Sequence, residues 1–284
     1  MALIVTVHGI GKQVLGPRTL KGEGWAASLA DGVEIAGGPV LRPPDINMAF
    51  YGDLFRPAGA KSFGEQEWGP EDVKHGYDLE LLGELASEAA KVEGIDRPEQ
   101  TKVRTPDAVQ AALRVLSRSR FFAGVAEHAM IWNLAQVRKY LTEPDVRASV
   151  QERVASAVTS DTRVIVGHSL GSVIAYEALM ANPNWPVRAL VTIGSPLGVP
   201  RLVFDRLRPA PHDGSGAWPP GIDSWSNIAD SGDIVALVKR LGPLFGPGIV
   251  EDFLVHNGAK AHDATPYLTA RETGAAIAAG LREP

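Results

Sequence analysis

Residues 162–179 read TRVIVGHSLGSVIAYEAL, and this stretch decides the fold. It begins with an apolar run that ends in Gly167-His168-Ser169-Leu170-Gly171, and a pattern typical of a helix follows. Small residues two positions before and two positions after Ser169 allow the backbone to turn tightly without a steric clash. The stretch therefore predicts a strand, a tight turn and a helix, with the Ser169 hydroxyl raised at the carboxyl edge of a sheet.

Strand-like and helix-like segments alternate along much of the chain. Strands are predicted at 3–7, 46–51, 163–167, 187–193, 224–229 and 251–256, and helices at 19–36, 78–92, 105–119, 121–141, 144–159, 171–181, 233–240 and 266–282. Short apolar strands separated by helices predict an α/β fold, with a mostly parallel sheet of about six strands flanked by helices. The segment 195–222 is rich in proline and is expected to be a loop. The simplest organisation is a single domain over residues 1–284 with a helical insertion at 55–143.

Composition excludes several classes of function. The net charge is −5 and no basic block appears, so no nucleic-acid partner is expected. The chain contains no cysteine, which rules out disulfides and thiolate chemistry. No apolar run approaches the roughly 20 residues that cross a bilayer, and the first residues lack the features of a secretory signal. We therefore expect a cytoplasmic protein without an integral membrane segment.

A serine on such a turn is typical of a nucleophile, which needs a histidine base, a carboxylate and oxyanion donors. After a G-x-S-x-G turn the partners follow in the order serine, carboxylate, histidine. His262 is the expected base, because it follows the last predicted strand and precedes a helix that Thr265 would cap and Pro266 would open. His256, which ends that strand, stays open as the alternative.

The carboxylate is expected to be Asp233. It follows the predicted strand 224–229 at the same sheet edge as Ser169, and Gly232 allows the turn to present it. A purely structural role would be to cap the predicted helix 233–240. Asp230 stays open as the alternative.

Two backbone amides are expected to bind an oxyanion. One is the N–H of Leu170, the residue after the serine. The other should come from the turn after the first strand, which contains the residues of VHGIG at 7–11; Ile10 is the first choice and Gly9 the second. His8 is expected to shape this loop and border the substrate rather than take part in the chemistry.

Cofactor motifs are weak in this sequence. Gly9 and Gly11 match the first two glycines of a dinucleotide-binding turn, but position 14 is valine. Gly11-Lys12 lacks the earlier glycine of a P-loop, because position 6 is threonine. No H-E-x-x-H motif or helical histidine pair indicates a metal. The sequence therefore predicts no cofactor and no metal.

The segment 121–141 has a wide apolar face that includes Phe121, Phe122 and Trp132. Two interpretations stay open. The segment is either a core helix, or a lid or substrate channel whose aromatic side chains contact an apolar group.

Five stretches together resemble the α/β-hydrolase family. They are VHGIG at 7–11, VGHSLGS at 166–172, TIGSPLG at 192–198, NIADSGDIVA at 227–236 and AHDATPYL at 261–268. The resemblance implies an eight-stranded, mostly parallel sheet and acyl-enzyme chemistry, with Ser169 as nucleophile, Asp233 as acid and His262 as base. This chain departs from the family in two ways: its oxyanion loop follows the first strand, which predicts a sheet trimmed to about six strands, and its helical block precedes the serine.

The sequence thus predicts a serine hydrolase that cleaves a carboxylic ester of a small-molecule or acyl substrate. A thioesterase, an amidase or peptidase on the same residues, and a non-catalytic binding protein are the alternatives. The sequence indicates neither the substrate nor the oligomeric state.

Overall fold

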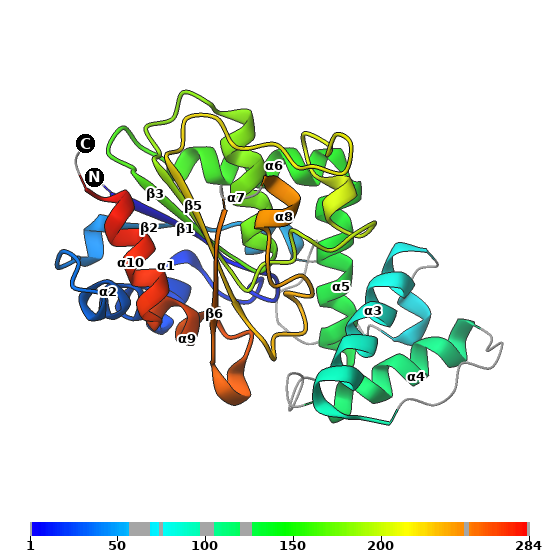
Figure 1. Cartoon of the computed structure of the whole chain (residues 1–284). Helices are drawn as coiled ribbons and strands as arrows, with labels where there is room; N and C mark the ends of the chain where they lie inside the picture. The colour runs from blue at the N-terminus through cyan, green and yellow to red at the C-terminus, as the bar shows by residue number, and fades with distance from the viewer. Residues whose placement is uncertain are drawn as a thin grey trace.

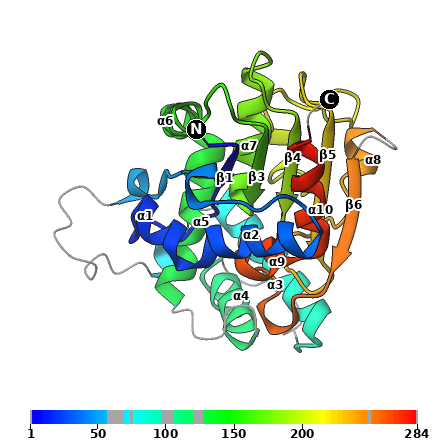
Figure 2. The same ribbon diagram turned by 90° about the vertical axis from the view of Figure 1, so that its left-hand side faces the viewer.

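A six-stranded parallel sheet forms the centre of the molecule. The computed structural model describes residues 2–56, 69–73, 76–96, 105–119, 127–246 and 250–282. The sheet order is β2-β1-β3-β4-β5-β6, and every neighbouring pair is parallel, which confirms the predicted α/β class. Figure 2 shows β1, β3, β4, β5 and β6 side by side in this order. The strands are β1 (Ile4–Val7), β2 (Ile46–Ala49), β3 (Val164–His168), β4 (Ala189–Ile193), β5 (Ser224–Asp230) and β6 (Val250–Val255).

Helices cover both faces of this sheet. Figure 1 shows α2 and α10 on one side of it and α6 and α7 on the other. The α-helices are α1 (Pro17–Leu20), α2 (Ala26–Ile35), α3 (Tyr77–Glu93), α4 (Thr105–Arg118), α5 (Glu127–Thr142), α6 (Pro144–Ala157), α7 (Leu170–Ala181), α8 (Gly242–Phe245), α9 (Ala264–Thr269) and α10 (Arg271–Gly280). A π-helical turn, Lys21–Trp25, joins α1 to α2.

Side chains that alternate along the strands supply two separate cores. Ile4 and Val164 are buried in the core on the side of α2 and α10, whereas Val5 and Ile165 are buried in the core on the side of α6 and α7. Full burial of one such side chain stabilises the fold by about 1.5–3 kcal/mol. Apolar burial on both faces explains why these strands read as nearly continuous hydrophobic runs.

The strand order places a crevice at the carboxyl ends of β1 and β3. From β1 the chain moves outward to β2, then returns to β3 on the opposite side of β1. Ligands of open α/β sheets bind where the strand order reverses in this way. The loop after β1 and the turn that holds Ser169 both lie at this point.

Three helices from the predicted insertion lie beyond the carboxyl edge of the sheet. Helix α5 packs against α6 and α3, and α3 packs against α4 (Figure 1). None of the helices in the described part of the chain is long and apolar enough to cross a membrane.

Two predicted helices differ from the structure. Residues 233–240 form no helix. Asp233 Oδ1 accepts the N–H groups of Val235 and Ala236 as a helix cap would, but the N–H of Leu237 bonds to Val235 O, and the Asp233 carbonyl accepts the Lys239 ammonium instead of the first helical N–H. The predicted helix 266–282 is two helices, α9 and α10, separated at Ala270, whose backbone is extended. Its expected cap was also wrong: Asp263, not Thr265, caps α9.

The last two helices are held against α2 by backbone contacts. A Cβ atom on Gly32 would lie 2.1 Å from the carbonyl oxygen of Leu268, and one on Gly274 would lie 1.8 Å from that of Gly32. Only glycine fits at both positions, so α2, α9 and α10 approach each other more closely than side chains would allow.

Candidate active site

Ser169 occupies a strained turn between β3 and α7. Its φ of 54° and ψ of −130° are rare for a residue with a side chain. A Cβ atom on Gly171 would lie 2.2 Å from the carbonyl oxygen of Val7, and one on Gly167 would lie 2.6 Å from Ser172 Cα. The two glycines therefore let β3, α7 and β1 close around the serine, as the sequence predicts.

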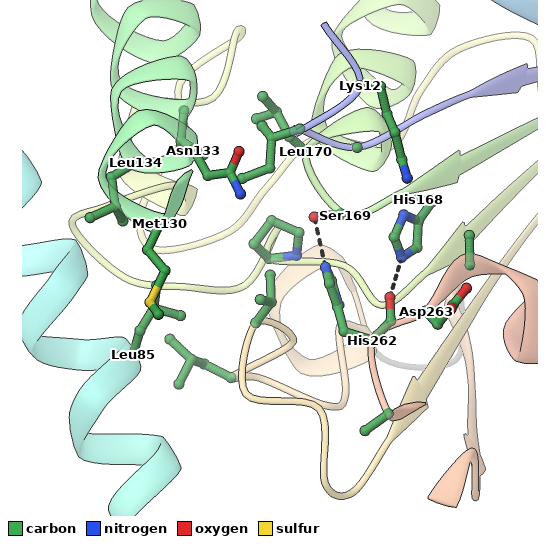
Figure 3. Close-up of a pocket in the computed structure, with 18 of the residues that line it drawn as sticks. Lys12, Leu85, Met130, Asn133, Leu134, His168, Ser169, Leu170, His262 and Asp263 are labelled. Carbon is green, nitrogen blue, oxygen red and sulfur yellow. Dashed lines mark hydrogen bonds between the residues drawn. The ribbon is translucent and has the colours of Figure 1, made fainter. Parts of the chain in front are cut away.

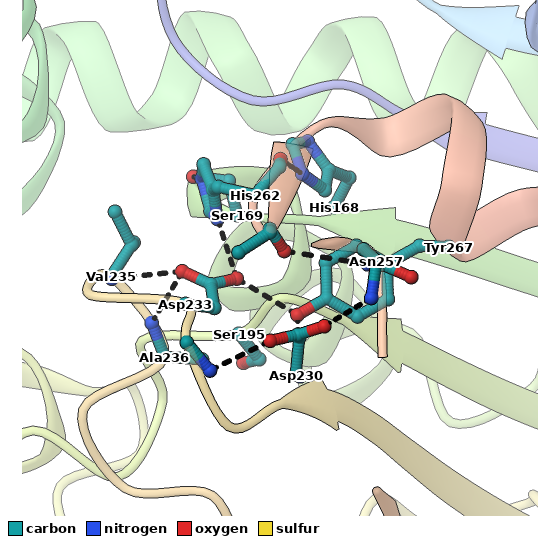
Figure 4. A network of polar contacts seen from close by, with 12 residues as sticks. His168, Ser169, Ser195, Asp230, Asp233, Val235, Ala236, Asn257, His262 and Tyr267 are labelled. Carbon is teal, nitrogen blue, oxygen red and sulfur yellow. Dashed lines mark hydrogen bonds and ion pairs between the residues drawn. The ribbon is translucent and has the colours of Figure 1, made fainter. Parts of the chain in front are cut away.

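The structure brings Ser169, His262 and Asp233 into one chain of hydrogen bonds. His262 Nε2 lies 2.9 Å from Ser169 Oγ, and His262 Nδ1 lies 2.8 Å from Asp233 Oδ2 (Figures 3 and 4). The carboxylate only accepts hydrogen bonds, so Nδ1 carries the proton and Nε2 is free to accept the serine proton. This tautomer is the one that a general base beside a hydroxyl requires.

Asp233 is fully buried and its two oxygens are saturated with donors. Oδ1 accepts the N–H of Val235 at 2.9 Å and of Ala236 at 3.3 Å, while Oδ2 also accepts the Tyr267 hydroxyl at 2.9 Å (Figure 4). Burial opposes ionisation, but His262 and these donors outweigh it and lower the pKa of Asp233. The carboxylate therefore stays ionised beside His262.

The alternative residues have other positions. Asp230 is buried and accepts the N–H groups of Gly232 and Asn257, so it shapes the loop ends near the site (Figure 4). His256 is exposed just after β6. It is Asp233 that accepts the hydrogen bond from His262 Nδ1, and it is His262 whose Nε2 faces Ser169 Oγ.

The two expected oxyanion donors lie beside the serine. Ile10, Gly9 and Leu170 all line the cavity that contains Ser169. Leu170 is the first residue of α7, where backbone N–H groups have no acceptor within the helix. A Cβ atom on Gly9 would lie 2.8 Å from Ser169 Cβ, so the loop after β1 packs directly on the serine.

His8 shapes the loop after β1, but it does not border the cavity. It is completely buried and stacks on Tyr51, with ring centroids 4.1 Å apart. Its Nε2 accepts the Tyr51 N–H at 3.2 Å, and its Nδ1 donates to Gly9 O at 2.6 Å. Burial lowers the pKa of His8 to about 4, so the ring is neutral at pH 7. The expected contact with substrate is therefore corrected to a structural role.

His168 is a positioning residue that the sequence did not reveal. Its Nε2 donates to the backbone carbonyl of His262 at 2.8 Å, and the two rings lie 4.7 Å apart (Figure 3). Burial, aided by the nearby His262, lowers the pKa of His168 to about 3. The neutral ring ties the loop that holds His262 to the end of β3.

A second missed feature is a buried pair of hydroxyls beneath the turn. Ser172 Oγ donates to the carbonyl oxygen of Ser169 at 2.6 Å, and Ser195 Oγ lies 2.7 Å from Ser172 Oγ. Ser195 in turn accepts the N–H of Leu197 at 3.2 Å. This chain of hydrogen bonds holds the strained turn to the loop after β4. Ser172 and Ser195 lie inside two stretches that carry the family resemblance, which was the only signal for them.

A cavity of about 590 Å³ lies beside Ser169 and His262. Helix α5 contributes Met130, Leu134 and Val137 to its wall, so this segment borders the candidate site. Trp132 lies on α5 but is not among the described residues that line the cavity. Phe121 and Phe122 lie outside the described residues.

The described residues contain no group of three or more His, Asp or Glu side chains that could hold a metal ion. Comparisons of the chain with models of protein families, with curated proteins and with solved structures found no match. The class of the molecule therefore rests on its own structure: a parallel sheet flanked by helices, with a serine, a histidine and an aspartate connected by hydrogen bonds at the carboxyl edge of the sheet.

Proposed function

We propose that this chain is a serine hydrolase of the α/β-hydrolase type that cleaves carboxylic esters. One observation carries the proposal: on a strained strand–helix turn, Ser169 Oγ lies 2.9 Å from His262 Nε2, whose Nδ1 lies 2.8 Å from buried Asp233. A histidine that is oriented by a carboxylate and faces a hydroxyl is the arrangement that activates a serine.

In the proposed acylation step, His262 Nε2 takes the proton of Ser169 as Oγ attacks the ester carbonyl carbon. Asp233 holds the imidazole in the required tautomer and stabilises the positive charge that forms on it. The tetrahedral intermediate then collapses, the ester C–O bond breaks, and His262 returns the proton to the departing alkoxide.

The negative charge of the tetrahedral oxygen needs donors that are already in place. The N–H of Leu170, at the N-terminus of α7, and the N–H of Ile10 are the proposed pair. Gln136 Oε1 accepts the N–H of Gly11 at 3.4 Å, and Gln136 Nε2 donates to Gln13 Oε1 at 3.1 Å. These two hydrogen bonds hold the loop that carries Ile10.

Deacylation repeats these steps with water. His262 removes a proton from a water molecule, the resulting hydroxide attacks the acyl carbon, and Ser169 leaves with the proton from His262. The cycle needs no cofactor.

The test is hydrolysis of p-nitrophenyl esters from acetyl to palmitoyl, with labelling by a fluorophosphonate. We expect Ser169→Ala to lose at least about 10⁴-fold in kcat and to lose the label. Ser156→Ala, at an exposed serine of α6, is the matched control and should keep both. An unmodified protein that neither hydrolyses an ester nor takes the label would contradict the proposal.

A further inference from the structure

The cavity beside Ser169 has two chemically different sides. Figure 3 shows Ser169 and His262 between a wall of helical side chains and a second region that contains Lys12, His168 and Asp263. The helical wall is almost entirely apolar and is contributed by α3, α4 and α5: Leu81, Leu82, Leu85, Leu116, Met130 and Leu134. An ester bound at Ser169 would thus place its two halves in different surroundings.

Lys12 is a half-buried charged side chain of the second side, where Asp263 is exposed. It lies two residues after Ile10, is half-buried and lines the cavity. Figure 3 shows its ammonium group directed toward His168, and its charge adds to the burial and to the effect of His262 that lower the pKa of His168. The cation is therefore held at the site rather than extended into solvent.

This ammonium has no carboxylate partner within the described part of the chain. None of the ion pairs there includes Lys12. Asp263 lines the same cavity, but its Oδ1 accepts the N–H of Thr265 at 3.0 Å as the cap of α9. A half-buried cation without a counter-ion attracts an anion more strongly than a solvated surface lysine does.

The two sides differ in their exposure to solvent, and this difference indicates which half of the ester each side binds. The helical side is formed by buried residues such as Leu82 and Leu116, whereas Asp263 on the other side is exposed. The acyl group stays on Ser169 after the first step, while the alcohol half must leave toward solvent. The acyl group therefore belongs on the helical side and the alcohol half on the side of Lys12.

We propose that Lys12 binds an oxyanion group, carboxylate or phosphate, on the alcohol half of an ester whose acyl half is apolar and lies against α3, α4 and α5. This inference rests on the proposed function for the reaction, but the recognition itself requires no turnover. Binding and hydrolysis can therefore be tested separately.

The experiment measures binding to Ser169→Ala protein by calorimetry, so that the ester stays intact. The probes are octanoyl esters of para-hydroxybenzoate, of para-hydroxyphenyl phosphate and of neutral para-hydroxybenzamide. We expect at least one anionic ester to bind about tenfold more tightly than the neutral one, and the two anions to reveal which group is preferred. Adding Lys12→Met should remove this preference, Lys12→Arg should retain it, and Lys139→Met, a half-buried lysine of α5 outside the cavity, should leave it unchanged.

Salt gives a second measurement that does not depend on a variant. Raising the ionic strength from about 0.05 to about 0.5 M should weaken binding of the anionic esters and leave the neutral one unchanged. Equal binding of all three esters, or an anion preference that survives Lys12→Met, would overturn the inference. If the protein prefers the anionic esters but hydrolyses no ester, the proposed function fails and the anion site at Lys12 stands. If the protein hydrolyses esters but shows no preference for the anionic ones, the anion site fails and the proposed function stands.

Discussion

Tyr267 and His262 share one oxygen of Asp233. The Tyr267 hydroxyl donates to Oδ2 at 2.9 Å, and the same hydroxyl accepts the backbone N–H of Asp230 at 2.7 Å. Tyr267 lies in α9, five residues after His262, and is fully buried. It therefore connects the helix after the histidine to the carboxylate that orients the histidine.

Replacement of Tyr267 by phenylalanine should affect both catalysis and stability. The pKa of Asp233 should rise, because one of the donors that lower it is lost, and the acid limb of the kcat/KM profile should move to higher pH. The buried N–H of Asp230 would lose its acceptor, which costs about 1–3 kcal/mol in the free energy of unfolding. Urea unfolding and pH–rate profiles measure the two effects.

Tyr140→Phe is the control for this variant. Tyr140 is also fully buried, but its hydroxyl donates to Glu177 Oε2 at 2.6 Å, between α5 and α7. This change should lower stability and leave the pH profile of hydrolysis unmoved. A shift of the profile in Tyr140→Phe, or its absence in Tyr267→Phe, would refute the positioning role.

Asp233→Asn should lower kcat by about 10⁴-fold, because an amide stabilises the wrong histidine tautomer.

The stability of the same variant, Asp233→Asn, should be less sensitive to acid than that of the unmodified protein. The native-state pKa of Asp233 lies below the ordinary value of 3.8, so its contribution to stability is present above that pH and is lost as the pH falls through the lowered value. Acid unfolding followed by circular dichroism should show a smaller loss for Asp233→Asn than for the unmodified protein below pH 3.8.

Two neutral buried histidines should make the protein sensitive to mild acid. The pKa values of His8 and His168 fall from the ordinary value of 6.5 to about 4 and about 3, so the unfolded chain binds two protons that the native chain does not. Stability should therefore fall as the pH drops below 6.5, with a slope that approaches about 2.7 kcal/mol per pH unit.

Urea unfolding at a series of pH values tests this slope with single variants. His168→Asn should reduce it by about half, since one of the two extra protons disappears. His212→Gln, at a side chain that is 91% exposed, should leave it unchanged. An unmodified slope in His168→Asn would show that His168 is not held neutral.

Gly9→Ala should damage catalysis more than folding. Its new methyl group would lie 3.3 Å from Ser169 Oγ as well as 2.8 Å from Ser169 Cβ, and a displacement of the nucleophile by about 1 Å can cost about 100-fold in rate. Gly83→Ala in α3, where a Cβ atom meets nothing within 4 Å, should instead stabilise the protein by up to about 1 kcal/mol and keep the rate. Steady-state kinetics and urea unfolding of the two variants make the comparison, which fails if both variants behave alike.

The helical wall should set the length of the acyl chain. Met130→Trp adds bulk to the cavity from α5, so the optimum among p-nitrophenyl esters should move to shorter acyl groups while acetate is still hydrolysed. Ile35→Trp, at an exposed position of α2, is the control. An unchanged chain-length profile in Met130→Trp would place the acyl group elsewhere.

The sequence predicted the centre of the sheet well because β1, β3 and β4 are buried on both faces. These three strands are short, largely apolar runs, and helices lie between β1 and β2, between β2 and β3 and between β3 and β4, as the parallel pairing requires. The part of the candidate site that lies in one short stretch, the turn around Ser169, could be predicted from the spacing of its residues. The proximity of Asp233 and His262 followed from the rule that parallel strands end at one edge.

What the sequence could not predict depends on contacts between distant segments. The stretch 233–240 has helical spacing and Asp233 makes the bonds of a helix cap, but the Lys239 side chain takes the Asp233 carbonyl that would accept the first helical hydrogen bond. His8 and His168 read alike as histidines beside glycines, and only the fold shows which one touches His262. The hydrophobic periodicity of the sequence does not predict which distant side chains will meet, because such contacts depend on how whole helices and strands pack.

The backbone contact of Gly32 with the last two helices has a consequence for folding. It joins the segment that carries Gly9 and Ile10 to the one that carries His262, although more than 200 residues separate them in the chain. Bringing two such distant segments together has a high cost in conformational entropy, so we expect this contact to form late in folding. During refolding we expect the helical circular dichroism signal to return first and ester hydrolysis last. The return of hydrolysis would then report when α2 packs against the last two helices.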